Sequence, residues 1–203
     1  MNNDLTVFIV DDDPDIRKAL TALMRSMELE SMSFQSAVEF LDVFDPMLSG
    51  CLLLDVRLPG MSGLELLERI NNQAVCLPAV VISAHAEVPT VVRAMRAGAL
   101  NFLKKPCRDQ ALWESIQEAF KWGAANRRRL ARQAKIHRRL EQLTRGEYDV
   151  LDRLMEGKSN RAIAADLCLS VRAVEVRRSK LMQKMKAKSL ADLIQMKMLD
   201  SFS

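Results

Sequence analysis

Short apolar runs alternate with helix-forming segments through residues 1–121, and this alternation limits the possible folds more than any other feature. The runs of strand length are 5–10, 51–54, 79–82 and 100–103, with a weaker one at 30–34. The segments with helical spacing of apolar residues are 16–27, 37–43, 64–70, 91–97 and 111–120. Such alternation is typical of a parallel sheet covered by helices on both faces. The sequence therefore predicts a doubly wound α/β domain with a five-stranded parallel sheet.

The rest of the chain shows helical patterns and no strand pattern. Residues 122–141 contain no proline and are rich in alanine, arginine and leucine, so they are expected to continue the fifth helix as a helical linker. Residues 142–203 contain four helix starts, each at a serine, threonine or asparagine suited to an N-cap. The starts are Thr144, Ser159 or Asn160, Ser170, and Ser189. We expect a small all-α domain of four helices here.

Charge is divided unevenly between these parts. Residues 1–121 hold 11 Lys/Arg and 17 Asp/Glu, a net charge of −6, whereas residues 122–203 hold 19 and 9, a net charge of +10. A strongly basic part favours a nucleic-acid partner, with a merely solvated basic surface as the alternative. The two parts are therefore expected to have different partners.

Composition excludes several classes of protein. No apolar run reaches the roughly 20 residues that span a bilayer, and the N-terminal segment lacks a signal-peptide pattern. The four cysteines form no CxxC pair, and with two histidines a structural zinc site is not expected. We expect a cytoplasmic protein with reduced, mostly buried thiols and no membrane partner.

Polar residues follow the ends of four predicted strands. Asp11, Asp12 and Asp13 follow the first, Asp55 the third, Ser83 the fourth and Lys104-Lys105 the fifth. Because the carboxyl ends of parallel strands meet at one edge of a sheet, these groups should lie together. Clustered carboxylates favour a hard cation such as Mg²⁺, and aspartate can accept a phosphoryl group. Asp13 and Asp15 are better explained as favourable charges at a helix N-terminus, and Lys104 as a solvated charge.

Specific stretches of the chain resemble two known families. The stretches "VDDD", "LLLDVRLPGMSGLEL", "VVISAHA" and "RAMRAGALNFLKKP" resemble the receiver domain of response regulators. The stretch from Leu143 to Leu193 resembles the LuxR-type helix-turn-helix domain. Together they are similar to two-component regulators of the FixJ/NarL type. The resemblance implies a flavodoxin-like receiver over 1–121, a long linker helix over 122–141 and a DNA-binding domain over 142–203.

The resemblance also implies a phosphorylation site. Asp55 is expected to accept a phosphoryl group from a cognate histidine kinase. Asp11 and Asp12 form the acidic pair, and they are expected to bind Mg²⁺ or Mn²⁺ together with Asp55 and the backbone carbonyl of Arg57. The receiver then catalyses only its own phosphorylation and dephosphorylation, so the protein is not expected to be an enzyme that acts on a separate substrate.

A switch is implied beside this site. Ser83 and Lys105 are expected to contact the phosphoryl group, with Phe102 as the switch aromatic and a cis bond between Lys105 and Pro106. Phosphorylation is expected to make the face near 89–103 dimerise and present the protein to promoter DNA. RNA polymerase is a further expected partner.

In the helical domain, the resemblance makes 169–185 the recognition helix. The candidates for DNA contact are Arg172, Glu175, Arg177, Arg178, Lys180 and Lys184. Glu175 is expected to accept a hydrogen bond from cytosine, and Arg177 or Arg178 to bind guanine. Arg172 and Lys184 are expected to touch phosphate or solvent.

Two other functions are weighed against this interpretation. A metal-dependent phosphatase that uses Asp55 as its nucleophile needs a second acid two residues further on, where this chain has Arg57. A regulator whose helical domain acts through protein contacts is disfavoured by the charge of +10.

Overall fold

The computed structural model describes residues 5–72 and 77–201, and Cys76 lies outside them. The chain divides into two compact units between Arg127 and Arg128. We describe each unit by itself. The first contains the sheet, and the second contains helices.

The first unit is built on a five-stranded parallel sheet with the order β2-β1-β3-β4-β5. Its strands are β1 (Thr6–Val10), β2 (Glu30–Phe34), β3 (Gly50–Leu54), β4 (Ala79–Ser83) and β5 (Ala99–Lys104). All five lie where the alternation predicted them, including the weak second one. The central strands β3 and β4 are buried along their whole length, as expected for a sheet that is covered on both faces.

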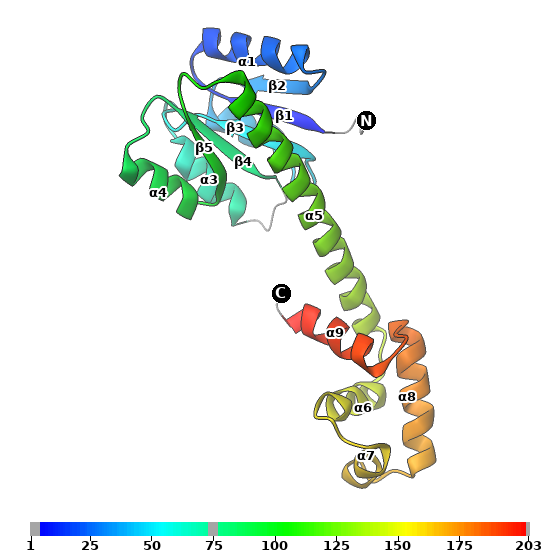
Figure 1. The fold of residues 1–203 in the computed structure, drawn as a ribbon. Coiled ribbons are helices and arrows are strands. Elements are labelled where there is room, and N and C mark those ends of the chain that lie inside the picture. The colour runs from blue at the N-terminus through cyan, green and yellow to red at the C-terminus, as the bar shows by residue number, and fades with distance from the viewer. Residues whose placement is uncertain (1–4, 73–76, 202–203) are drawn as a thin grey trace. The chain divides into compact units, whose positions relative to one another are not determined.

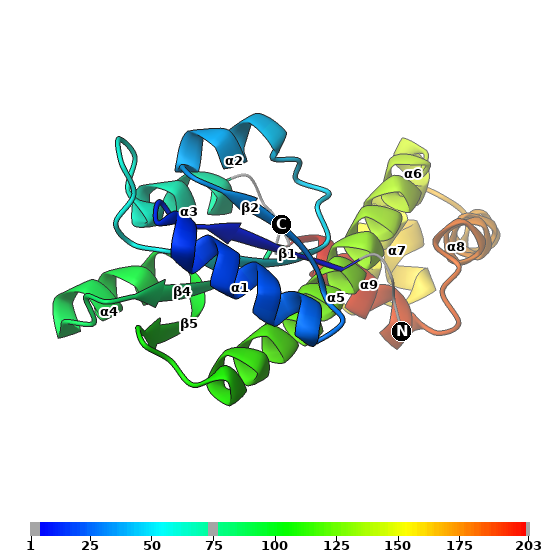
Figure 2. The ribbon, with the colours of Figure 1, turned by 90° about the horizontal axis from the view of Figure 1, so that it is seen from above.

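Helices cover both faces of this sheet (Figure 1 and Figure 2). They are α1 (Pro14–Ser26), α2 (Ala37–Val43), α3 (Gly63–Asn71), α4 (Val88–Arg96) and α5 (Asp109–Glu141). On one face, Ile9 and Leu53 of the sheet pack in a core with Met24 of α1 and Ile116 of α5. On the other face, a second core contains residues of α2, α3 and α4. The predicted doubly wound α/β fold is confirmed.

Local capping explains where these helices begin. The side chain of Asp13 accepts hydrogen bonds from the first turn of α1, which confirms its role at the helix N-terminus. Ser36 caps α2 by accepting from Glu39 N. Ser62 and Glu65 form a reciprocal capping box at the start of α3. Short sequence patterns therefore explain these helix starts without reference to tertiary contacts.

The second unit contains the C-terminal part of α5 and four further helices. These are α6 (Arg145–Met155), α7 (Asn160–Asp166), α8 (Val171–Met185) and α9 (Leu190–Ser201). Thr144 begins α6 in a capping box, and Ser159 and Ser170 cap α7 and α8. Ile136 and Leu140 of α5 are buried in the same core as α6–α9. The segment that the sequence assigned to the linker thus supplies part of the core of this unit.

Two further expectations concern membranes and cysteines. Within 5–72 and 77–201, no helix has the length and apolar character needed to cross a membrane. Cys51 is buried, and burial strongly raises the pKa of its thiol. Cys107 is half-buried and Cys168 is exposed, so burial of the thiols is less general than expected. The thiols of all three are free.

Candidate phosphorylation site and DNA-reading helix

A buried pair of carboxylates shares one ammonium group at the carboxyl edge of the sheet. Asp11 directly follows β1 and Asp55 directly follows β3, and they are 3% and 7% exposed. Lys105, which follows β5, donates from Nζ to Asp11 Oδ2 at 2.5 Å and to Asp55 Oδ1 at 2.9 Å. The rule that strand ends converge therefore placed these three residues correctly.

Backbone donors orient the other oxygens of the two carboxylates. Arg57 N donates to Asp55 Oδ2 at 2.6 Å, and Asp13 N donates to Asp11 Oδ1 at 3.0 Å. Each of the four carboxylate oxygens thus accepts a hydrogen bond. Arg17 also donates from Nη1 to the carbonyl oxygen of Asp11 at 2.7 Å. Sequence reasoning missed Arg17, although a basic residue in the first helix after an acidic turn was a usable signal.

The ammonium group of Lys105 stays charged in this setting. Its partial burial alone would lower the pKa of Lys105, but the hydrogen bonds and charges of Asp11 and Asp55 outweigh burial and raise this pKa. The carboxylates of Asp11 and Asp55 thus share one ammonium group. Clustered carboxylate oxygens of this kind suit a hard cation.

The donor set fits Mg²⁺, although no group of three acidic, histidine or cysteine side chains comes together within the described part of the chain. Asp12 is exposed, unlike Asp11 and Asp55. Mg²⁺ keeps several waters and needs only one or two carboxylates from the protein. Asp55, Asp11 or Asp12, and the carbonyl of Arg57 offer oxygen atoms of the right kind.

Ser83 and Phe102 lie on neighbouring strands at the same edge. Ser83 is 1% exposed, and its Oγ accepts from His85 N at 3.3 Å. Its carbonyl oxygen accepts from Lys105 N at 2.9 Å, next to the Lys105–Pro106 bond, which is cis as expected. Phe102 is partly buried against the core beneath α2–α4. Ser83 therefore lies one backbone hydrogen bond away from Lys105.

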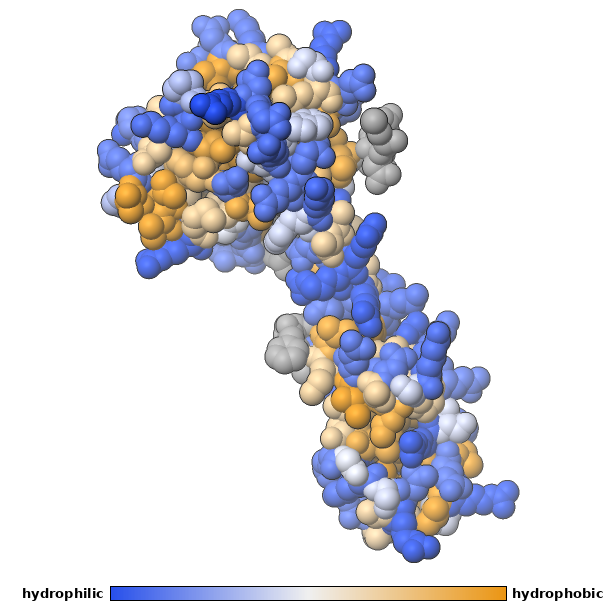
Figure 3. Space-filling model, in the orientation of Figure 1, coloured by the Kyte–Doolittle hydropathy of each residue, from blue (hydrophilic) through white to orange (hydrophobic). Residues whose placement is uncertain are grey.

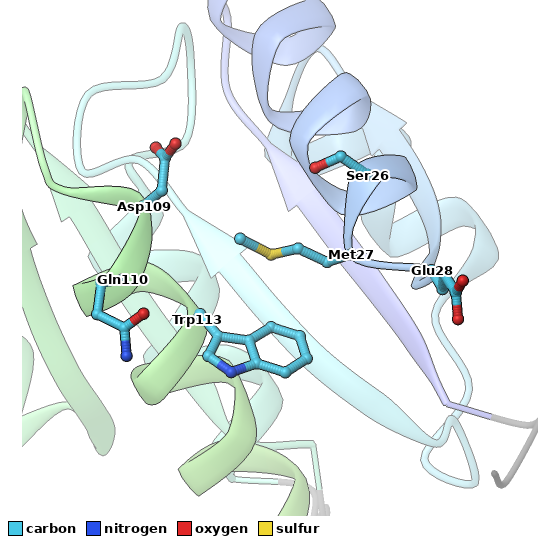
Figure 4. Close-up of a pocket in the computed structure, with 6 residues that line it drawn as sticks. All are labelled: Ser26, Met27, Glu28, Asp109, Gln110 and Trp113. Carbon is cyan, nitrogen blue, oxygen red and sulfur yellow. The ribbon is translucent and has the colours of Figure 1, made fainter.

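A separate depression lies between the end of α1 and the start of α5 (Figure 4). Its volume is about 390 Å³, and it is lined by Ser26, Met27, Glu28, Asp109, Gln110 and Trp113. It is lined by none of the residues Asp11, Asp55, Ser83 and Lys105, which we call the acidic edge. The chemistry that the sequence indicates therefore belongs to the strand ends and not to this depression.

In the second unit, the six candidates on α8 divide into two groups. Arg172, Glu175 and Lys180 are exposed, as a role in DNA contact requires. The other three contact the unit itself: Arg178 Nη1 donates to Asn160 Oδ1 at 2.8 Å, and Arg177 lies against Gly146, where an added Cβ would be 2.7 Å from Arg177 Nη1.

Lys184 also belongs to this inner group, although its side chain remains 33% exposed. Its Nζ donates to Glu147 Oε2 at 2.6 Å and to the carbonyl oxygen of Gln142 at 3.1 Å. The side chain of Glu147 is only 5% exposed. Burial by itself would raise the pKa of Glu147, but hydrogen bonds from Lys184 and Thr144 hold it below its usual value. Lys184 therefore ties α8 to α6.

Val176 was missed by sequence reasoning. It is 48% exposed on α8, and Val171 is 40% exposed nearby. Because Val176 lies four residues after Arg172, both share the outward face of the helix, and this spacing was a usable signal. An apolar side chain on such a face can contact the methyl group of thymine.

Comparison with known proteins agrees with both units. Residues 7–117 match the family described as response regulator receiver domain, and residues 141–197 match the family described as bacterial regulatory proteins, luxR family. The transcriptional regulatory protein FixJ of Azorhizobium caulinodans is 38% identical, over 98% of this chain and 94% of the relative. Nodulation protein W of Bradyrhizobium diazoefficiens is 40% identical, over 94% of this chain and 84% of the relative.

Comparison with solved structures agrees with these family matches. A low-resolution structure of the response regulator StyR matches with a TM-score of 0.83 and 39% identity, covering 96% of this chain and 98% of that one. Full-length FixJ from B. japonicum matches with a TM-score of 0.58 and 35% identity, covering 98% of each chain. The acidic edge with its lysine, the helical unit and these matches together lead to one conclusion: the chain belongs to the FixJ-type response regulators and is a transcriptional regulator with a receiver domain and a LuxR-type helix-turn-helix domain.

Proposed function

We propose that a cognate histidine kinase phosphorylates this regulator on Asp55 and that phosphorylation controls its binding to promoter DNA. The observation that carries the proposal is the shared hydrogen bonding of Lys105 to Asp55 and Asp11 at 2.9 and 2.5 Å. It holds the Asp55 carboxylate at the sheet edge beside a permanent positive charge. Positive charge beside the acceptor stabilises the charge of a transferring phosphoryl group.

The residues of the edge then have separate roles. A carboxylate oxygen of Asp55 attacks phosphorus, the phosphorus–nitrogen bond to the histidine of the kinase breaks, and the electron pair leaves with the imidazole. Lys105 and the hydroxyl of Ser83 hold phosphoryl oxygens. Mg²⁺ or Mn²⁺, held by Asp55, Asp11 or Asp12 and the carbonyl of Arg57, supplies further positive charge. The chain acts on itself and on no separate substrate.

Dimerisation through α4 and β5 connects this chemistry to DNA in the proposal. Three apolar side chains of α4 are well exposed: Val88 by 75%, Val92 by 43% and Met95 by 47%. Phosphorylation favours one of two states if the phosphoryl group interacts better with that state, and Phe102 lies on β5 beside this face. Two copies present two copies of α8 to two half-sites in the cytoplasm, where RNA polymerase is a further partner.

Phosphodonor and metal should act together in solution. With acetyl phosphate and Mg²⁺, we expect the full chain to shift from monomer to dimer and to bind promoter fragments more tightly. Chelation of Mg²⁺ should prevent both changes, because the phosphoryl group then lacks part of its charge compensation. Light scattering and DNA mobility shifts measure the two effects. Identical mass and DNA affinity with and without phosphodonor would contradict the proposed control.

Glu175 should contribute sequence preference and not general affinity. We expect Glu175→Ala to lose about 1–3 kcal/mol of discrimination at one base pair, because its carboxylate can accept from a cytosine amino group. Asp152→Ala, which removes an exposed acid from α6, is the matched control. Competition binding with every single-base variant of the site measures the loss. If both variants keep the parent's preferences, Glu175 does not read a base.

A further inference from the structure

The C-terminal part of α5 is at least as basic as α8, whose residues 171–185 hold five Lys/Arg and one Asp/Glu, a net charge of +4. Residues 128–141 of α5 hold six Lys/Arg and one Asp/Glu, a net charge of +5. Residues 142–203 hold twelve and eight, a net charge of +4, although they are more than four times as many. The 14 residues of α5 thus carry more net charge than the whole helical domain that follows.

Within the helical domain, several basic side chains are engaged in ion pairs or internal contacts. Lys184 pairs with Glu147, and Lys158 pairs with Glu156 at 2.7 Å and Asp166 at 2.6 Å. Arg177 and Arg178 of α8 turn inward. The outward face of α8 keeps one acidic residue, Glu175, and two basic residues, Arg172 and Lys180. This face is suited to reading bases, but it offers little attraction for phosphates.

Three basic residues of α5 form a stripe on one side of the helix. Arg128, Arg132 and Lys135 are spaced i, i+4 and i+7 and are all exposed. None of the three has an ion-pair partner in the part of the chain that the structure describes. Arg128 and Arg132 also line a cleft of about 250 Å³ beside Leu199 of α9. Figure 3 shows hydrophilic surface along this part of α5.

We infer that this basic stripe (Arg128, Arg132 and Lys135) is a second DNA-contacting surface that binds backbone phosphates beyond the bases read by α8. The inference rests on DNA binding by the helical domain. Guanidinium groups match phosphate oxygens with two parallel hydrogen bonds, and ammonium groups add point charges. Such contacts give affinity without sequence preference.

Contacts within the unit link the stripe to α8. Arg139, four residues after Lys135, donates from Nη1 to the carbonyl oxygen of Met185 at 2.8 Å, at the C-terminal end of α8. DNA bound by α8 is thereby held at high local concentration near α5. This favours DNA over a small phosphate-bearing ligand or an acidic protein as the partner of the stripe.

The test is the salt dependence of DNA binding by the phosphorylated full chain. Arg128→Gln/Arg132→Gln/Lys135→Gln keeps side chains of good helix propensity and removes three charges. If each binds one phosphate, the log–log salt slope falls by about 2.7, and the loss of affinity between 50 and 200 mM salt becomes about 40-fold smaller. The affinity for random and specific DNA should fall by the same factor.

A matched control variant distinguishes the loss of the basic stripe from a general loss of positive charge. Arg25→Gln/Arg69→Gln/Arg108→Gln removes three exposed charges from the first unit and should leave the slope unchanged. An unchanged slope in the stripe variant, or an equal fall in the control, would overturn the inference and leave DNA binding itself intact. A selective loss of specific binding would show that the stripe positions α8 instead. If the parent bound no DNA, the proposed function and this inference would fail together.

Discussion

Asp55→Asn is expected to abolish stable labelling of the protein by acetyl phosphate. The substitution removes the nucleophilic carboxylate but keeps the size of the side chain, and the amide oxygen that it introduces still accepts from a backbone donor such as Arg57 N. Lys105 keeps Asp11 as a partner at 2.5 Å, so the edge of the sheet should remain folded. Labelling with a radioactive donor, read as acid-stable and hydroxylamine-labile phosphate, measures the effect.

Asp42→Asn is the control for this experiment. Asp42 is an exposed acid on α2, so its substitution makes the same change of charge away from the edge. It should label like the parent, and circular dichroism should show the same helix content in all three proteins. Undiminished label on the Asp55 variant would show that another residue accepts the phosphoryl group.

Lys184→Met should destabilise the helical unit by about 1–3 kcal/mol. The substitution leaves the Glu147 carboxylate buried with its hydrogen bond from Thr144 N but without its cation, and the loss of a charge-assisted hydrogen bond costs about this amount. Because the side chain of Lys184 is 33% exposed, water can reach part of the gap, and the loss should stay below that of a fully buried pair. Hydrogen exchange of α6 and α8 in the full chain measures the loss locally.

The loss of stability caused by Lys184→Met should become smaller as the pH falls. The folded state holds the pKa of Glu147 below its usual value, so the pair stabilises fully at pH values above the unfolded pKa of about 4.3. This contribution disappears as the pH falls through the lower folded pKa. The free energy of unfolding of the helical unit should therefore differ most between the parent and the Lys184 variant near neutral pH. This difference should become smaller at acidic pH.

Two further variants test whether the loss of stability comes from the ion pair between Lys184 and Glu147. Lys180→Met removes an exposed lysine from the same helix and should change the exchange of α6 and α8 little. Glu147→Gln/Lys184→Met leaves no buried charge and should recover part of the loss. Equal exchange in the Lys184 variant and the parent would mean that the ion pair contributes nothing to stability.

Local patterns predicted most of the first unit. The alternation of apolar runs and helical spacing located all five strands, most clearly β3 and β4, which are buried along their whole length. The start of α4 was predicted three residues late, at 91 instead of Val88. Its N-cap, Glu87, makes no side-chain cap hydrogen bond, so the usual start signal is missing, and Pro89 in the first turn marks the true beginning.

The acidic edge was predictable for a reason that does not apply to α8. Parallel strands bring their carboxyl ends together whatever their separation in sequence, so Asp11, Asp55 and Lys105 could be placed side by side from topology. On α8, Val174 and Leu181 lie in the core, yet Arg177, Arg178 and Lys184 were predicted to contact DNA or solvent. Their spacing of three or four from the core residues puts them on the inner side. Their partners on α6 and α7 could not be known from the sequence pattern.

These inner contacts of α8 define which positions could be exchanged to retarget the regulator to a new operator. Arg177, Arg178 and Lys184 fix the rotation of the helix about its own axis, through Gly146, Asn160 and Glu147. A transplant of a whole foreign helix would break these contacts and turn its side chains away from the groove. Substitutions limited to residues 172, 175, 176 and 180 would alter the face of α8 that contacts bases and would keep the orientation of the helix.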